Sequence, residues 1–166
     1  IEKRLYINFV PTHFELGENQ LYESFAISAI LRKNVPITVE DGPYFRQLTD
    51  LGHRHGLPVV LHSCGAIKRV IPDLIELGVN ALHPLQAKAD NMSAESLAEF
   101  KGKIAFIGGI DTQDLLVNGT PEEVKADVRR VKKLLGPCFV VSPSHETLLP
   151  NVPPRNVAAM ATAAIE

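Results

Sequence analysis

The sequence has no long apolar run, no block of like charge and only two cysteines. A membrane-spanning helix needs about 20 consecutive apolar residues. The 17 basic and 19 acidic residues, with a net charge of −2, do not form the basic footprint of a nucleic-acid-binding or anionic-membrane-binding protein. Two cysteines cannot build a disulfide framework, and the first residues lack the pattern of a signal peptide. We therefore expect a cytoplasmic protein that binds neither nucleic acid nor membrane.

What the chain does contain is a regular alternation of apolar runs and amphipathic segments. Its 166 residues are 45% hydrophobic, enough for one compact domain spanning 1–166. From residue 57 onward the alternation repeats about every 25 to 35 residues, the size of a βα unit, and four units are visible. Such an order predicts a parallel sheet and the α/β class, because parallel neighbours need a crossover. The predicted strands are 58–62, 79–84, 103–110 and 138–143.

The helices that follow these strands carry sequence signals at their ends. Ser93 has the position of an N-cap. Thr120, Pro121 and Glu123 form a capping-box pattern at the start of a helix that Gly136-Pro137 would stop. In the less regular first 56 residues, 4–10 reads as a strand, and 18–33 and 42–56 read as amphipathic helices.

Polar residues gather just after the predicted strands. In parallel α/β folds, ligands bind at the carboxyl ends of the strands. Each of the four strand ends carries groups able to hold a ligand. They are His62, Ser63 and Cys64 at the first; His83 and Gln86 at the second; Gly108, Gly109, Asp111 and Gln113 at the third; and Ser142, Ser144, His145 and Glu146 at the fourth.

His62 and Cys64 stand two residues apart at the first strand end. Imidazole nitrogen and thiolate sulfur are ligands that zinc prefers, and a catalytic zinc uses three protein ligands and keeps one position open. His145 is the best third ligand, and His83 is an alternative unless it is structural. Cys138 lies at the opposite end of its strand and is interpreted as a buried thiol. Without a metal, His62 would be a histidine that caps the strand and Cys64 a small buried thiol.

The third strand end offers a different set of groups. Gly108 and Gly109 let the backbone approach a ligand closely or adopt a positive φ, and with Gln86 and Gln113 they are candidates for holding a cofactor. Asp111 is either a carboxylate for proton transfer or cation binding, or the N-cap of the following turn. Glu146 is a second candidate for proton transfer.

Three segments together resemble one known family. "GLPVVLHSCGAIKRVIPDLIELGVNALHPLQ", "FIGGIDTQDLLVNGTPEEV" and "SPSHETLLPNVPPRNVAAM" are similar to the carboxyl half of the uroporphyrinogen decarboxylase superfamily over about residues 43–166. The resemblance implies a parallel (β/α)8 TIM barrel. A complete barrel needs about 250 residues, so the chain would cover only part of it. We expect missing segments or a join near residues 31–43, where the pattern breaks.

The two branches of that superfamily imply different chemistry. The cobalamin-dependent methyltransferases bind zinc through a H-x-C pair, matched by His62 and Cys64, and a third ligand on the last strand. His145 stands where the coenzyme M enzymes usually have cysteine, which favours relatives resembling O-demethylases over a thiol substrate. The resemblance thus implies a zinc-dependent methyltransferase with a small-molecule methyl donor or acceptor and a corrinoid on a partner protein; a homodimer stays open.

Two other functions fit parts of the pattern. His145 also matches a histidine of the true decarboxylases of porphyrin biosynthesis, which use neither metal nor cofactor. Their substrate-binding arginines lie in the amino-terminal half, whose motifs are not visible here, and H-x-C is not a decarboxylase feature. The last alternative is a non-catalytic barrel that binds a tetrapyrrole or a partner protein. Metal content would separate the first two functions.

Overall fold

The computed structural model describes residues 7–15, 21–29, 42–145 and 147–166, and its chain clusters into two compact units. Unit 1 comprises residues 1–63 and 69–82, and unit 2 comprises residues 64–68 and 83–166. The predicted join falls mostly outside the described residues. The elements are β1 (Ile7–Glu15), β2 (Leu21–Ala29), α1 (Gly42–Arg54), β3 (Val60–His62), α2 (Ile71–Glu76), β4 (Ala81–Leu85), α3 (Ala94–Leu97), β5 (Ala105–Ile110), α4 (Leu115–Asn118), α5 (Pro121–Leu135), β6 (Phe139–Pro143) and α6 (Pro154–Ile165).

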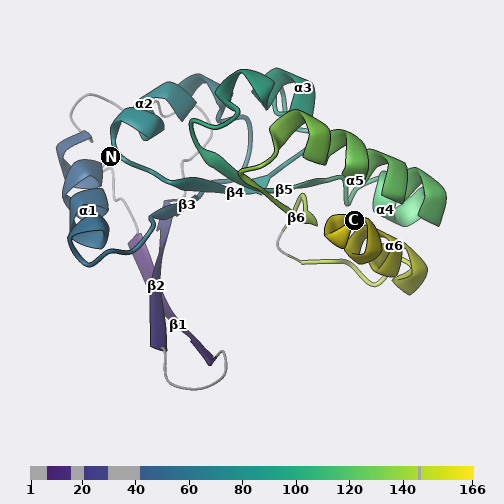
Figure 1. Cartoon of the computed structure of the whole chain (residues 1–166), viewed down its shortest axis with the longest axis horizontal. Helices are drawn as coiled ribbons and strands as arrows, with labels where there is room; N and C mark the ends of the chain where they lie inside the picture. Colours follow the sequence, from purple (N-terminus) through teal and green to yellow (C-terminus); the bar gives the residue numbers. More distant parts are fainter. Residues whose placement is uncertain (1–6, 16–20, 30–41, 146) are drawn as a thin grey trace, which may run out of the picture. The chain divides into compact units, whose positions relative to one another are not determined.

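In unit 1, a β-hairpin precedes the first of the predicted strands. β1 pairs antiparallel with β2, and β2 pairs in parallel with β3 (Figure 1). The helix predicted over 18–33 is therefore wrong. Leu21 and Phe25 have helical spacing, but Phe25 and Ile27 equally fit the two-residue period of a strand, and a nine-residue partner strand decides between them.

The rest of unit 1 follows the predicted strand and helix order. The helix predicted over 42–56 is α1, and its buried Thr49 donates a hydrogen bond to the Leu77 carbonyl just after α2. Pro72 is the second residue of α2, where its missing N–H costs nothing, so the helix begins near Pro72 and is not kinked by it. Asn80 Oδ1 accepts the Val59 N–H at 2.7 Å and contacts His53 Nε2 at 2.8 Å.

In unit 2, β5 and β6 pair in parallel and α5 packs against both strands. The apolar stripe of α5 is fully buried, as its helical spacing predicts, and α6 lies alongside it (Figure 1). Ser93 caps α3, as predicted, by accepting the Ser96 N–H at 3.2 Å. The buried stripe of α5 consists of Val124, Val128, Val131 and Leu135.

The capping box of α5 has the predicted geometry. Thr120 Oγ1 accepts the Glu123 N–H at 3.2 Å, and Glu123 Oε2 accepts the Thr120 N–H at 2.7 Å. The hydrogen bond from the Thr120 backbone lowers the pKa of Glu123. A Thr120→Ala variant should therefore be less stable to urea by about 1 kcal/mol at pH 7.

The pH dependence of this cap follows from the lowered pKa of Glu123. The ionised carboxylate stabilises the fold above its unfolded pKa, and this contribution is lost as the pH falls through the lower folded value. Urea titrations of Glu123→Gln and the wild-type protein should converge in acid and diverge at neutral pH. A constant difference between the two proteins across this range would contradict the assignment.

Gly108 brings β5 close to the backbone of β4. Its φ is +124°, and a Cβ at this position would lie only 2.5 Å from the backbone nitrogen of Leu85. Gly109 also has a positive φ, of +83°, but a Cβ there would meet only ordinary contacts. The paired glycines therefore do adopt positive φ, and the close approach at Gly108 is to a neighbouring strand.

Candidate functional site

The chain segments that follow β5 and β6 are held together beyond the strands themselves. The register pairs Ile110 with Pro143, and the next backbone N–H, that of Ser144, donates to the Ile110 carbonyl at 2.7 Å. The Thr112 N–H in turn donates to Ser144 Oγ at 3.2 Å. The sheet thus fixes the two strand ends side by side.

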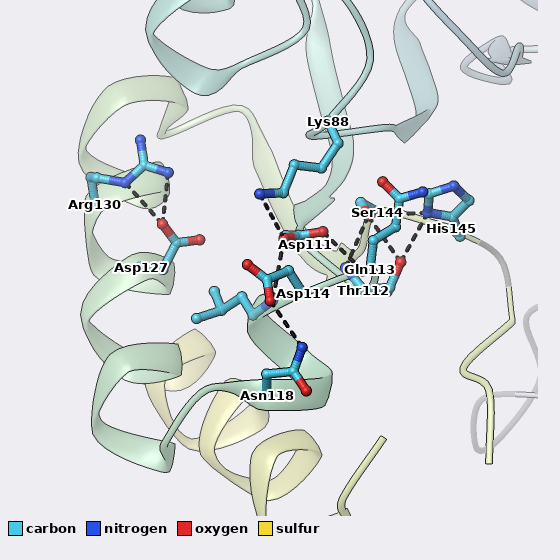
Figure 2. A network of polar contacts seen from close by, with 11 residues as sticks. Lys88, Asp111, Thr112, Gln113, Asp114, Asn118, Asp127, Arg130, Ser144 and His145 are labelled. Atoms are coloured by element: carbon cyan, nitrogen blue, oxygen red, sulfur yellow. Dashed lines mark hydrogen bonds and ion pairs between the residues drawn. The ribbon is translucent and has the colours of Figure 1, made fainter. Parts of the chain in front are cut away.

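Asp111 shapes the turn between β5 and α4. One carboxylate oxygen accepts the Gln113 N–H at 2.9 Å and the other accepts the Leu115 N–H at 3.2 Å, while Lys88 Nζ lies 3.4 Å from the carboxylate (Figure 2). Asp111 is buried, with 7% of its surface exposed. Of the two interpretations of Asp111, this geometry matches the capping residue, and its role in proton transfer stays a prediction.

His145 is held through one ring nitrogen by two hydroxyl groups. Its Nδ1 lies 2.9 Å from Thr112 Oγ1 and 3.2 Å from Ser144 Oγ, and the two hydroxyl oxygens are 3.1 Å apart (Figure 2). Ser144 is only 1% exposed, so burial holds its hydroxyl group in place beside the other two groups. Because Nδ1 is engaged in this way, Nε2 is the ring nitrogen left to meet a ligand.

The turn after Cys64 is also tied to a neighbouring strand end. Gly65 has a φ of +90°, and its N–H donates to Gln86 Oε1 at 2.9 Å. The thiol of Cys64 is exposed. Gln86 therefore fixes the backbone immediately beyond Cys64.

Cys64, Gln86, Thr112 and His145 line one pocket of unit 2, with a volume of about 530 Å³. The polar walls come from the ends of β4, β5 and β6, and Val117 and Leu149 add apolar surface. A pocket of this size accommodates a small organic molecule. Four of the predicted site residues meet here: Cys64, Gln86, Gln113 and His145.

The described residues that line this pocket do not include the other predicted site residues. His62 is the last residue of β3 and belongs to unit 1. Gly109 and Asp111 line a second cleft of unit 2, of about 480 Å³, and Gly108 faces the backbone of β4. Glu146 lies outside the described residues.

Two smaller expectations need correction. Cys138 is exposed, as is the preceding Pro137, because both residues lie before the first residue of β6. Cys138 is therefore not the buried thiol that the sequence predicted. His83 lies within β4 and not in the loop after it. Since β4 continues to Leu85, Gln86 is the first polar residue after this strand.

The second cleft has charged walls that are mostly paired with one another. Arg130 binds the carboxylates of Asp127 and Glu95 (Figure 2 shows the pair with Asp127). Desolvation disfavours the Arg130 cation, but the hydrogen bonds to Asp127 and Glu95 outweigh it and raise its pKa. Backbone hydrogen bonding at the start of α3, helped by Arg130, lowers the pKa of Glu95. The pair of Arg130 with Glu95 joins α5 to α3.

The fit of a zinc ion can be judged from the donors in the first pocket. A thiol and an imidazole line this pocket, and the imidazole is oriented through its second nitrogen, as metal-bound histidines are. Among the residues that the structure describes, no three His, Cys, Asp or Glu side chains form one metal-binding group. The donor atoms of Cys64 and His145 are of the kind that zinc prefers, and a zinc site formed by His62, Cys64 and His145 stays a prediction.

Thr112 is the part of the site that the sequence reasoning missed. Its position one residue after Asp111, at a strand end, could have pointed to it. Its partner His145, however, is 33 residues away in the sequence. No helix within the described ranges is long and apolar enough to cross a bilayer.

Comparison with known proteins yields a family, a curated relative and a solved structure. The family model of uroporphyrinogen decarboxylase (URO-D) matches residues 41–166, more than half of the chain. Methylcobamide:CoM methyltransferase MtbA of Methanosarcina mazei is 26% identical over 118 residues, which are 71% of this chain and 29% of the relative. The chain thus spans less than a third of that relative's length.

The solved structure is a methyltransferase from Methanosarcina mazei. It matches with a TM-score of 0.56 at 19% sequence identity, over 84% of this chain and 41% of the other. At this sequence identity, the similarity of the two structures shows a common fold and nothing about function. The α/β class, as part of a barrel of the URO-D type, agrees with the sequence prediction.

Proposed function

Because the chain belongs to the uroporphyrinogen decarboxylase family, we propose that it is part of a cytoplasmic, zinc-dependent methyltransferase that moves a methyl group between a small molecule and a corrinoid protein. The observation that carries the proposal is the pocket shared by Cys64 and His145. The named activity of its relative from Methanosarcina mazei, a methylcobamide:CoM methyltransferase, supports the same branch.

The proposed metal ligands are His62, Cys64 and His145. Cys64 would bind as the thiolate and His145 through Nε2, since its Nδ1 is already hydrogen-bonded to Thr112 and Ser144. When bound there, zinc would supply Lewis-acid chemistry toward an ether oxygen, an alcohol or a thiol. Cys64 and His145 would then be the two ligands from unit 2. Each is tied to another strand end, Cys64 through the bond from Gly65 to Gln86 and His145 through its contact with Thr112.

The remaining pocket residues would orient the substrate. Gln113 lines the pocket with an exposed amide that can both donate and accept hydrogen bonds, whereas the Gln86 carbonyl oxygen already accepts the Gly65 N–H. Leu149 and Val117 would contact apolar parts of the substrate. Asp111 and Glu146 are the proposed groups for proton transfer. The corrinoid would be bound to a separate protein.

The proposal is tested by the metal content of the protein after expression with added zinc. We expect about one equivalent of zinc in the wild-type protein and less than about a tenth in Cys64→Ser, because a catalytic zinc rarely survives the loss of one of three protein ligands. Cys138→Ser is the matched control, since Cys138 is also an exposed thiol but lies before β6 and not in the pocket. It should keep the metal.

Other outcomes of this experiment point to the other functions. Wild-type protein without zinc that releases carbon dioxide from a porphyrinogen under anaerobic conditions would be a decarboxylase, and the methyltransferase proposal would be wrong. Wild-type protein that has neither zinc nor turnover, but binds a tetrapyrrole, would be the non-catalytic barrel.

A further inference from the structure

We propose that Thr112 is a positioning residue that fixes the imidazole ring of His145, so that Nε2 is the nitrogen presented to the ligand. The identity of the ligand in this inference rests on the proposed function. The contact between Thr112 and His145 is independent of that function. Thr112 Oγ1 lies 2.9 Å from His145 Nδ1, the shorter of the two hydroxyl contacts to the ring (Figure 2).

Thr112 can serve this purpose because its backbone is held from two sides. On one side, the carboxylate of Asp111 fixes the turn by accepting the N–H groups of Gln113 and Leu115. On the other side, the Thr112 N–H donates to Ser144 Oγ, and Ser144 is anchored to Ile110 through its own N–H. The hydroxyl of Thr112 therefore projects from the hydrogen-bonded turn after β5 toward His145, which follows β6.

The contact determines what His145 can do. A hydrogen bond at one imidazole nitrogen fixes the tautomer and the orientation of the ring, and so sets which nitrogen is left for a metal or a substrate. Ser144 alone would hold Nδ1 less well, because its oxygen is 3.2 Å away and also accepts the Thr112 N–H. Thr112 thus couples the end of β5 to the ligand-binding nitrogen after β6.

The first test uses metal-free protein labelled with ¹⁵N-histidine, at a pH where the imidazoles are neutral. In Thr112→Val, which keeps the shape of the side chain and removes the hydroxyl, we expect the Nδ1 resonance of His145 to move while the resonances of His53 stay in place. Thr112→Ser should restore the wild-type spectrum. Thr162→Val, on the exposed face of α6, is the matched control and should change nothing at His145.

The second test measures zinc affinity by competition with a chelator. Loss of a group that orients a metal ligand typically weakens binding about 10- to 100-fold, so we expect this loss in Thr112→Val, recovery in Thr112→Ser and no change in Thr162→Val. An unchanged Nδ1 resonance in Thr112→Val would overturn the inference. Wild-type affinity for zinc in Thr112→Val would overturn it as well.

The two measurements also separate this inference from the proposed function. If the wild-type protein binds no zinc, the metal of the proposed function is wrong. The Nδ1 resonance of His145 in Thr112→Val then decides alone whether Thr112 holds the ring.

Discussion

Gly108→Ala is expected to lower the free energy of unfolding by about 3 kcal/mol or more, a large fraction of the total stability of an ordinary domain. Two effects add at this position. An alanine with a φ of +124° is strained, which costs about 1 to 2 kcal/mol. In addition, its Cβ would lie 2.5 Å from the Leu85 nitrogen, and backbone atoms of β4 cannot move aside as a flexible side chain would.

The control for this prediction is Gly102→Ala. Gly102 has a φ of +75°, and a Cβ there would meet no atom within 4 Å, so this variant has the strain without the overlap. We expect it to lose only about 1 kcal/mol. Urea unfolding followed by circular dichroism measures both variants. Equal losses in the two would mean that β5 does not approach β4 as closely as the structure has it.

The order of strands and helices after residue 57 was readable from the sequence because each element has a strong local signal. The capping box at Thr120 and the apolar stripe of α5 are examples, and both are found as predicted. The strand predicted over 4–10 overlaps β1, but the second strand of the hairpin was not readable, since its residues fit both the helical and the strand period and only the pairing with β1 decides between them. Caps and apolar periodicity in a short stretch of sequence predict a single helix or strand, whereas the pairing of two strands depends on both of them.

The candidate site shows the same division. Cys64, Gln86, Gln113 and His145 were singled out because they follow strands, and the parallel arrangement does bring them to one pocket. Gly108 has the positive φ that was one of its two predicted uses, and its role in holding a cofactor stays a prediction. Its close approach to Leu85 was not foreseen, because the sequence shows that a glycine permits close approach but not what approaches it. Contacts of Thr112 with residues 32 and 33 positions away were likewise invisible.

Replacing His145 should remove the proposed activity with little loss of stability. Asparagine places an amide near the position of Nδ1, where it can still bond to the Thr112 and Ser144 hydroxyls, but it has no group at the position of Nε2. We expect His145→Asn to unfold within about 0.5 kcal/mol of the wild-type protein. Its methyl transfer with methylcobalamin and a panel of small thiols and methyl ethers should fall about 10²- to 10⁴-fold, together with its zinc affinity.

His145→Gln is the complementary variant, because its longer side chain carries an amide to the position of Nε2 and leaves Nδ1 unreplaced. Zinc binds imidazole, thiolate and carboxylate far more readily than a neutral amide, so this variant should also lose the metal. If His145→Asn keeps both its zinc and its turnover, Nε2 has no part in the reaction and the third ligand must be sought elsewhere. If His145→Asn keeps zinc but loses turnover, His145 acts on the substrate, and Cys64 and His62 bind the metal with another partner.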